Sequence, residues 1–176
     1  MILDAVRAAN ISDIGDIARL VNSAYRPKFG AHGWTHEADL IVGARTDANQ
    51  VAGLLSKPDS IVLLGLIRSE IAACVHIERI GGDSCIGMLA VNPPRQDLGI
   101  GKELLAHTEH YARTKFLSDR CVMMVVSLRI ELISFYQRRG YQRTGSAMPY
   151  PQMANSGTPL EAGLKIEMLE KSTGSR

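Results

Sequence analysis

A glycine-containing loop follows an apolar segment near the middle of the chain. The apolar segment ends at Val91, and Gly99, Gly101 and Lys102 lead into a predicted helix whose apolar residues recur at helical spacing from Leu104. The first N–H groups of a helix have no internal partner and carry partial positive charge, and glycines let an anion approach the backbone. The segment therefore predicts a binding site for a phosphate or pyrophosphate.

Three known phosphate loops can be compared with this segment. A Walker A loop needs Gly five residues before the Gly-Lys pair and Ser or Thr after it, where this chain has Gln96 and Glu103. A Rossmann fingerprint needs a third glycine, where this chain has Leu104. The remaining pattern, Gln/Arg-x-x-Gly-x-Gly/Ala, is matched by Gln96, Gly99 and Gly101. It resembles the acetyl-coenzyme A pyrophosphate loop of the GNAT superfamily of N-acetyltransferases.

A second segment strengthens this resemblance. The run from Phe135 to Tyr141 resembles the Phe/Leu-Tyr-x-x-x-Gly-Phe/Tyr segment that follows the fifth strand in the GNAT family. The chain departs from the family at Arg129 and Leu132, where Asn and Ala are frequent and the Asn commonly contacts the cofactor. Arg129 is interpreted either as a phosphate contact or as a solvent-facing side chain.

The resemblance implies that an amine attacks the thioester carbonyl of acetyl-CoA through a tetrahedral oxyanion, which fixed N–H donors must stabilise. It also implies the residues that bind the cofactor, namely Leu89, Ala90, Val91, Gln96, Asp97, Leu98, Gly99, Ile100, Gly101, Lys102, Ser127 and Arg129. Tyr136 matches the family tyrosine that donates a proton or hydrogen bond to the leaving sulfur. The alternative is a packing tyrosine in an aromatic cluster with Phe135 and Tyr141. Ser127 either contacts pantetheine or only ends a strand, and basic residues from Arg138 to Arg143 face the CoA 3′-phosphate or solvent.

The acceptor amine arrives protonated, so a base is needed directly or through water. Glu78 is the predicted base, with Glu37 as a second candidate. His76 and Glu78 alternate onto one strand face, so they point either into the acceptor cleft or to solvent. The predicted acceptor residues are Tyr25, Trp34, Glu37 and His76, with Tyr150 as a further aromatic candidate. Trp34 serves equally well as a loop anchor.

The elements that position these residues follow from their patterns. Strands are expected at 2–8, 60–68, 71–80, 84–91, 121–127 and 164–170, with tight turns at 69–70 and 81–83. Helices are expected after caps at 12–13, 35 and 47, after the phosphate loop, and at 131–139, whereas 145–163 reads as irregular. The expected fold class is α/β (α+β): a mixed, mostly antiparallel central sheet of about six or seven strands, flanked by helices and splayed between strands 4 and 5. Residues 1–176 are expected to form one domain.

Composition excludes several classes of protein. The 176 residues are 45% hydrophobic and 22% charged, and a formal net charge of +2 is too small to indicate nucleic-acid binding. No long apolar run or cationic leader indicates a membrane span or a signal peptide. Cys74, Cys85 and Cys121 lack metal spacing and read as free thiols of a cytoplasmic protein. The histidine pairs 32/36 and 107/110 lack a third ligand, so no metal is expected.

The predicted function is acetyl transfer from acetyl-CoA to the primary amine of a small molecule by direct attack. A peptide or protein acceptor, at an N-terminus or a lysine, is the alternative. A non-catalytic acyl-CoA-binding module and a nucleotide-binding protein of another fold are further alternatives. Neither a nucleic-acid nor a membrane partner is expected, and the sequence admits a homodimer.

Overall fold

The computed structural model describes residues 1–28, 36–151 and 156–174. Seven strands form one sheet in the order β1-β3-β4-β5-β6-β9-β7. Their bounds are β1 Ala5–Ala8, β3 Ser60–Ile67, β4 Glu70–Ile80, β5 Asp83–Val91, β6 Arg120–Val126, β7 Gln142–Pro149 and β9 Lys165–Ser172. Two short strands, β2 Ile41–Val42 and β8 Thr158–Pro159, pair separately. The α-helices are α1 Ile14–Tyr25, α2 Ala48–Ser56, α3 Ile100–Thr114 and α4 Ile130–Gln137, and η1 Ile11–Asp13 and η2 Pro93–Arg95 are single 3₁₀ turns.

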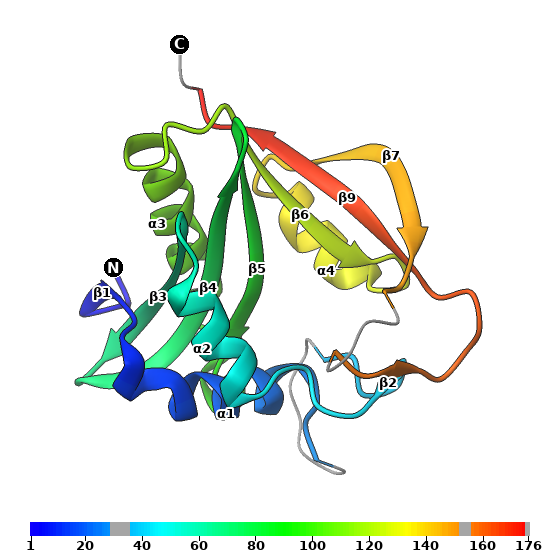
Figure 1. Ribbon diagram of the computed structural model, residues 1–176, viewed down its shortest axis with the longest axis horizontal. Helices are drawn as coiled ribbons and strands as arrows, with labels where there is room; N and C mark the ends of the chain where they lie inside the picture. Colours follow the sequence, from blue (N-terminus) through cyan, green and yellow to red (C-terminus); the bar gives the residue numbers. More distant parts are fainter. Residues whose placement is uncertain (29–35, 152–155, 175–176) are drawn as a thin grey trace.

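The sheet opens between β5 and β6. These neighbours are parallel, whereas the other pairs of the sheet are antiparallel. Their register runs only from Asp83–Arg120 to Ile86–Met123, although β5 continues to Val91. Figure 1 shows the two strands meeting at one end and diverging toward the other. The predicted splay between the fourth and fifth strands of the main sheet is therefore confirmed.

A β-bulge lies in β5 where the strands diverge. The β4–β5 register places His76 opposite Gly87 and Cys74 opposite Ala90, so Val75 faces two residues of β5. Met88 takes a positive φ of 51°, which is unusual for a residue with a side chain. The extra residue puts Ile86 and Met88 into the core clusters on opposite faces of the sheet. The bulge thus re-aims the strand just before the phosphate loop.

Helices cover both faces of the sheet. On one face, Ile17 and Val21 of α1 and Val51 of α2 are fully buried against Val62 and Leu64 of β3. On the other, residues of α3 and α4 pack in one cluster with β4, including Ile100, Leu104, Leu105, Ile133, Tyr136, Val75 and Ile77. Burial of each such aliphatic side chain contributes about 1.5–3 kcal/mol. None of the helices in the described ranges is long and apolar enough to cross a membrane.

Capping residues read from the sequence explain the start of α2 but not that of α1. Asp47 caps α2 as predicted, because its Oδ1 accepts a hydrogen bond from the Gln50 N–H at 2.8 Å. Asp13 occupies the N-cap position of α1, within the predicted pair 12–13, but its side chain makes no capping hydrogen bond there. Asn10 caps η1, the 3₁₀ turn that precedes α1. The Asp13 carboxylate instead receives two hydrogen bonds from Arg7, at 2.7 and 2.8 Å.

Two further segments differ from the predicted secondary structure, because their conformation depends on strands that are distant in the sequence. The helix predicted after residue 35 is replaced by one turn and β2, whose Ile41 pairs with Pro159 of β8. Gly43, at φ 96°, then turns the chain. The segment expected to be irregular from 145 begins inside the edge strand β7. β9 lies between β6 and β7, so the last strand in the chain is an inner strand of the sheet.

Candidate active site

Two cavities meet where β5 and β6 diverge. The first, about 260 Å³, is lined by the end of β5, the loop before α3, and one face of α4. The second, about 290 Å³, is lined by the β5 bulge, β6, the end of α1 and residues near β2. Four residues line both cavities: Tyr25, Leu89, Leu132 and Tyr136. The opening in the sheet is therefore the junction of two binding spaces.

The first cavity contains the predicted phosphate loop. Gly99, at φ 84°, is the N-cap of α3 in the left-handed region, where a side chain would be strained. A Cβ added to Gly101 would lie 3.4 Å from Cγ2 of Val91 and 3.8 Å from Cζ of Phe135, so a larger side chain would fill the cradle. Lys102 lines the same space. This arrangement fits a pyrophosphate held on the first turn of α3.

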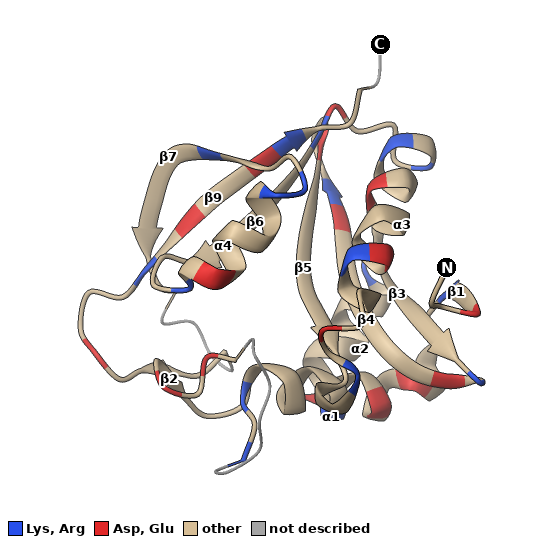
Figure 2. Cartoon of the chain, turned by 180° about the vertical axis from the view of Figure 1, so that it is seen from behind, with Lys and Arg blue, Asp and Glu red and all other residues tan. Residues whose placement is uncertain are grey.

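Arg138 and Arg139 add positive charge to this cavity from the end of α4. Figure 2 shows blue, the colour of Lys and Arg, at the end of α4. The guanidinium of Arg139 lies over the ring of Phe135, 3.5 Å from its centroid, and donates to the Phe135 carbonyl oxygen at 2.5 Å. Arg138 lines the same cavity, and the contact of this segment with a phosphate stays a prediction.

Most of the predicted cofactor residues line the first cavity: Leu89, Ala90, Val91, Gln96, Asp97, Gly99, Ile100, Gly101 and Lys102. The Gln96 carboxamide donates to the Val91 carbonyl oxygen at 3.2 Å and so ties the loop to the end of β5. Leu98 does not line the cavity, and it is exposed at the tip of the loop. Ser127 lines neither cavity, because its hydroxyl donates to the carbonyl oxygen of Lys165 at 2.9 Å and ends the β6–β9 pairing.

Tyr136 stands at the junction. Its ring makes edge-to-face contacts with Phe135 and Tyr141, at centroid distances of 5.2 and 5.8 Å, so the packing predicted as the alternative role is present. The same ring lines both cavities. Burial, aided by the neighbouring Tyr25, raises the pKa of Tyr136 far above its ordinary value. The phenol therefore stays protonated at neutral pH and is available as a donor.

Tyr25 closes the other side of the junction. It is the last residue of α1, and its hydroxyl donates to the carbonyl oxygen of Leu89 at 3.3 Å. Burial raises the pKa of Tyr25 to about 12. Two neutral phenols thus flank the place where the cavities meet.

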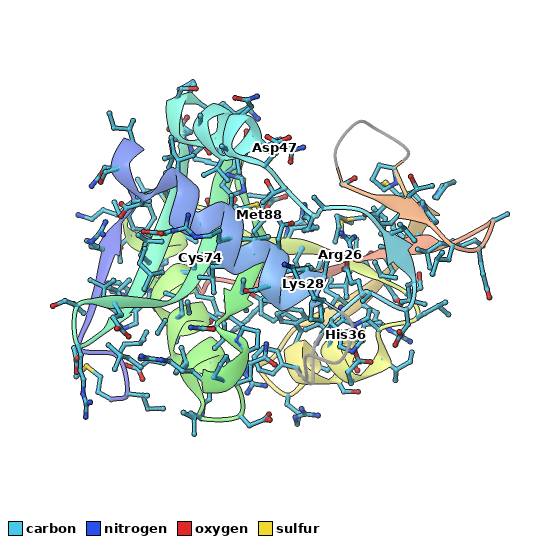
Figure 3. The ribbon with its side chains drawn as sticks, turned by 90° about the horizontal axis from the view of Figure 1, so that it is seen from below. Arg26, Lys28, His36, Asp47, Cys74 and Met88 are labelled. Atoms are coloured by element: carbon cyan, nitrogen blue, oxygen red, sulfur yellow. The ribbon has the colours of Figure 1, made fainter. Side chains whose placement is uncertain are left out.

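A buried ion-pair network borders the second cavity. The Glu37 carboxylate receives a hydrogen bond from Nη2 of Arg26 at 2.9 Å, and its other oxygen lies 3.8 Å from Nη1 of Arg129. Nε of Arg129 pairs with Glu131 at 2.5 Å. Figure 3 shows Arg26 just past the end of α1. Arg129 is 3% exposed, so the predicted solvent-facing placement is wrong. It lines neither cavity, and its contact with a phosphate stays a prediction.

The two strand residues predicted for the acceptor side lie elsewhere. Glu78, the predicted base, lines neither cavity, and its carboxylate pairs with Lys57 at 2.5 Å on the face that α2 covers. Nε2 of His76 is 2.9 Å from the Ser60 hydroxyl. Neither residue lines a cavity, because their contacts are with the end of α2 and the start of β3. Trp34 lies outside the described residues.

Sequence reasoning missed two arginines near the second cavity. Arg26 holds Glu37, and Arg45 lines the cavity itself. Neither belongs to a motif, because the folding of the segment after α1 brings them to the site. No group of three or more His, Cys, Asp or Glu side chains in the described part of the chain is placed to hold a metal.

Comparisons with known proteins agree with this geometry. Residues 58–143 match the family described as acetyltransferase (GNAT) domain. An N-acetyltransferase from Staphylococcus aureus Mu50 has 19% identity and a TM-score of 0.72, covering 96% of this chain and 97% of that one. The ribosomal-protein-S18-alanine N-acetyltransferase from Escherichia coli has 13% identity and a TM-score of 0.70, with 96% and 93% covered. A chimeric spermidine N-acetyltransferase from Vibrio cholerae has 10% identity and a TM-score of 0.69, with 96% of both chains covered.

No curated protein sequence matches the chain. The solved structures therefore establish the fold, and the sequence match from β3 to the start of β7 relates this segment to the GNAT acetyltransferase domain. Over this segment the chain is similar to the GNAT acetyltransferases, a family that uses acetyl-CoA as cosubstrate.

Proposed function

We propose that this protein transfers the acetyl group of acetyl-CoA to the primary amine of a small molecule. The observation that carries the proposal is the meeting of the two cavities at Tyr136, Tyr25 and Leu89. One cavity offers a loop suited to a pyrophosphate, and the other offers a separate, mainly apolar space. A direct transfer needs such an arrangement, because both substrates must be bound together with their reacting atoms in contact.

The first cavity is assigned to the cosubstrate. The first turn of α3, with Gly99, Gly101 and Lys102, holds the pyrophosphate, and the end of β5 borders the pantetheine arm. Leu89 has no partner residue in the β4–β5 register because it belongs to the bulge. We assign its N–H as a donor to the oxyanion that forms on the thioester carbonyl.

The chemical step needs one bond made and one broken. The neutral amine attacks the carbonyl carbon, a C–N bond forms, and the C–S bond breaks to release the CoA thiolate. The amine nitrogen loses a proton as the amide forms. Tyr136 donates a hydrogen bond or a proton to the departing sulfur from its place at the junction. Its raised pKa favours the hydrogen bond over full proton transfer.

Glu37 is assigned a positioning role for the amine. It is the carboxylate among the described lining residues of the second cavity. Its two carboxylate oxygens already face the guanidinium groups of Arg26 and Arg129. We therefore assign it a hydrogen bond to the amine, with the ammonium proton leaving through water.

A small acceptor is favoured by the size of the second cavity. Its volume of about 290 Å³ lies at the lower end of the range for small-molecule sites. Incubation with acetyl-CoA and a panel of primary amines and short peptides, followed by measurement of free CoA, tests the proposal. Amine-dependent release of CoA is expected for small amines. Tight CoA binding with no acetyl transfer to any acceptor would instead support the acyl-CoA-binding module.

A further inference from the structure

One positively charged side chain at the second cavity, that of Arg45, has no carboxylate partner among the described residues. The guanidinium groups of Arg26 and Arg129 are matched by the carboxylates of Glu37 and Glu131 in one connected network. Arg45 lines the same cavity and takes no part in that network. Within residues 1–28, 36–151 and 156–174, no carboxylate lies within 4.0 Å of the Arg45 guanidinium to form an ion pair.

Arg45 lies close to the junction of the two cavities. Its guanidinium carbon lies 5.4 Å from the centroid of the Tyr25 ring, and that ring lines both cavities. Burial raises the pKa of Tyr25, and the charge of Arg45 opposes that rise. The charge of Arg45 therefore acts on a residue that lines both cavities.

The backbone around Arg45 is held in place by α1. Oδ1 of Asn22 accepts hydrogen bonds from the N–H groups of Arg45, at 2.7 Å, and Thr46, at 3.2 Å. Nδ2 of Asn22 donates to the Thr46 carbonyl oxygen at 2.9 Å. Asp47 then caps α2. The arginine thus projects from a fixed segment between two helices, which lowers the entropic cost of binding an anion.

The rest of the cavity wall is mainly apolar. Its lining includes Ile86, Met88, Met123, Val125, Val126 and Ile166. An isolated cation beside such a wall fits a ligand that has an apolar body and one anionic group. A polycation would find a poor partner here, because Glu37 is already bound by arginines.

We propose that the acceptor is an apolar amine that carries a carboxylate next to the amino group, as an apolar α-amino acid does, and that Arg45 binds this carboxylate. The inference rests on the proposed acetyl transfer. The guanidinium forms a bidentate pair with the carboxylate, while the adjacent amine faces the junction at Tyr136. The apolar side chain of the acceptor fills the space beside Met88 and Met123.

The test compares each amino acid with its own decarboxylated amine. Leucine, methionine and phenylalanine are paired with 3-methylbutylamine, 3-(methylthio)propylamine and phenethylamine, and kcat/KM is measured by free-CoA release. The wild type is expected to prefer the amino acids. Arg45→Met is expected to reduce that preference about 10- to 100-fold, the range for a charge-assisted hydrogen bond. Arg45→Lys is expected to retain part of it. Arg19→Met, which removes an exposed arginine paired with Asp16, is the matched control.

A binding measurement gives a readout that does not depend on turnover. Calorimetry with 4-methylpentanoate and 3-phenylpropionate, added to the CoA complex, is expected to show binding that Arg45→Met weakens by a similar factor. Equal loss for amino acids and amines in Arg45→Met, or a wild type that favours the amines, would overturn the role of Arg45 while leaving acetyl transfer intact. CoA binding without transfer to any acceptor would overturn the proposed function, and this inference with it.

Discussion

The hydroxyl of Tyr25 donates a hydrogen bond to the carbonyl oxygen of Leu89 across 3.3 Å. Tyr25 ends α1, and Leu89 belongs to the β5 bulge, so this contact fastens a helix on one face of the sheet to the strand that opens it. Both residues line both cavities. The wall between the two binding spaces is therefore held by a bond between segments that are far apart in the sequence.

The phosphate loop gives the first prediction. Gly101→Val is expected to weaken CoA binding by about tenfold or more, because a branched side chain would enter the cradle beside Val91 and Phe135. Isothermal titration calorimetry with CoA measures the effect. Gly53→Val is the matched control, because a Cβ at that exposed position in α2 meets no atom within 4 Å. A folded Gly101→Val protein with wild-type affinity would show that the pyrophosphate lies elsewhere.

The second prediction concerns the leaving group. Tyr136→Phe is expected to lower kcat by about 100-fold with little change in acetyl-CoA affinity, because the lost interaction strengthens only in the transition state. Steady-state kinetics together with CoA titration measure both quantities. Tyr111→Phe, which removes a hydroxyl from a residue lining neither cavity, is expected to keep wild-type turnover. If chemistry limits the rate and Tyr136→Phe turns over normally, Tyr136 serves only in packing.

The third prediction concerns the buried network. Glu37→Gln is expected to lower the free energy of unfolding by about 3–5 kcal/mol, because Arg26 and Arg129 would lose the charge that compensates them in a buried place. Urea denaturation measures the loss. Glu70→Gln breaks the exposed pair with Arg95 and is expected to cost less than about 1 kcal/mol. Equal losses in the two variants would mean that the network adds nothing beyond a surface pair.

The fourth prediction concerns pH. Burial lowers the pKa of His76, with Lys57 and Arg45 acting in the same direction and Glu78 opposing them. Below a pH of about 6.5 the unfolded chain therefore binds a proton at His76 more readily than the folded chain does. Neutral His76 contributes fully to the free energy of unfolding above that pH, and this contribution is lost as the pH falls below it.

His76→Gln is expected to show a smaller drop in the free energy of unfolding between pH 7.5 and pH 5.5 than the wild type. Urea denaturation at the two pH values provides the comparison. His107→Gln, on the exposed side of α3, is expected to keep the wild-type drop. An unchanged drop in His76→Gln would assign the pH dependence to other groups.

Part of the fold and of the site was predictable because the residues that define it are close together in the sequence. The phosphate loop combines a strand end, two glycines and a helix start within a few residues, and the cap of α2 joins Asp47 to a residue three positions away. Hairpins predicted at 69–70 and 81–83 join β3 to β4 and β4 to β5 in antiparallel pairs. The order of the outer strands and the pairing of β2 with β8 were not predictable, since each depends on a partner far along the chain.

The sequence by itself determined the glycine-containing start of α3 and the place of Tyr136 on the helix that follows β6. Residue type and local backbone conformation suffice to define both. Only the tertiary structure decided which residues line the second cavity. It separated Glu78 from the junction, buried Arg129, and brought Arg26 and Arg45 to the second cavity. The physical reason is that charge pairing and burial depend on distances between segments, and alternation along one strand cannot tell which helix will cover a face.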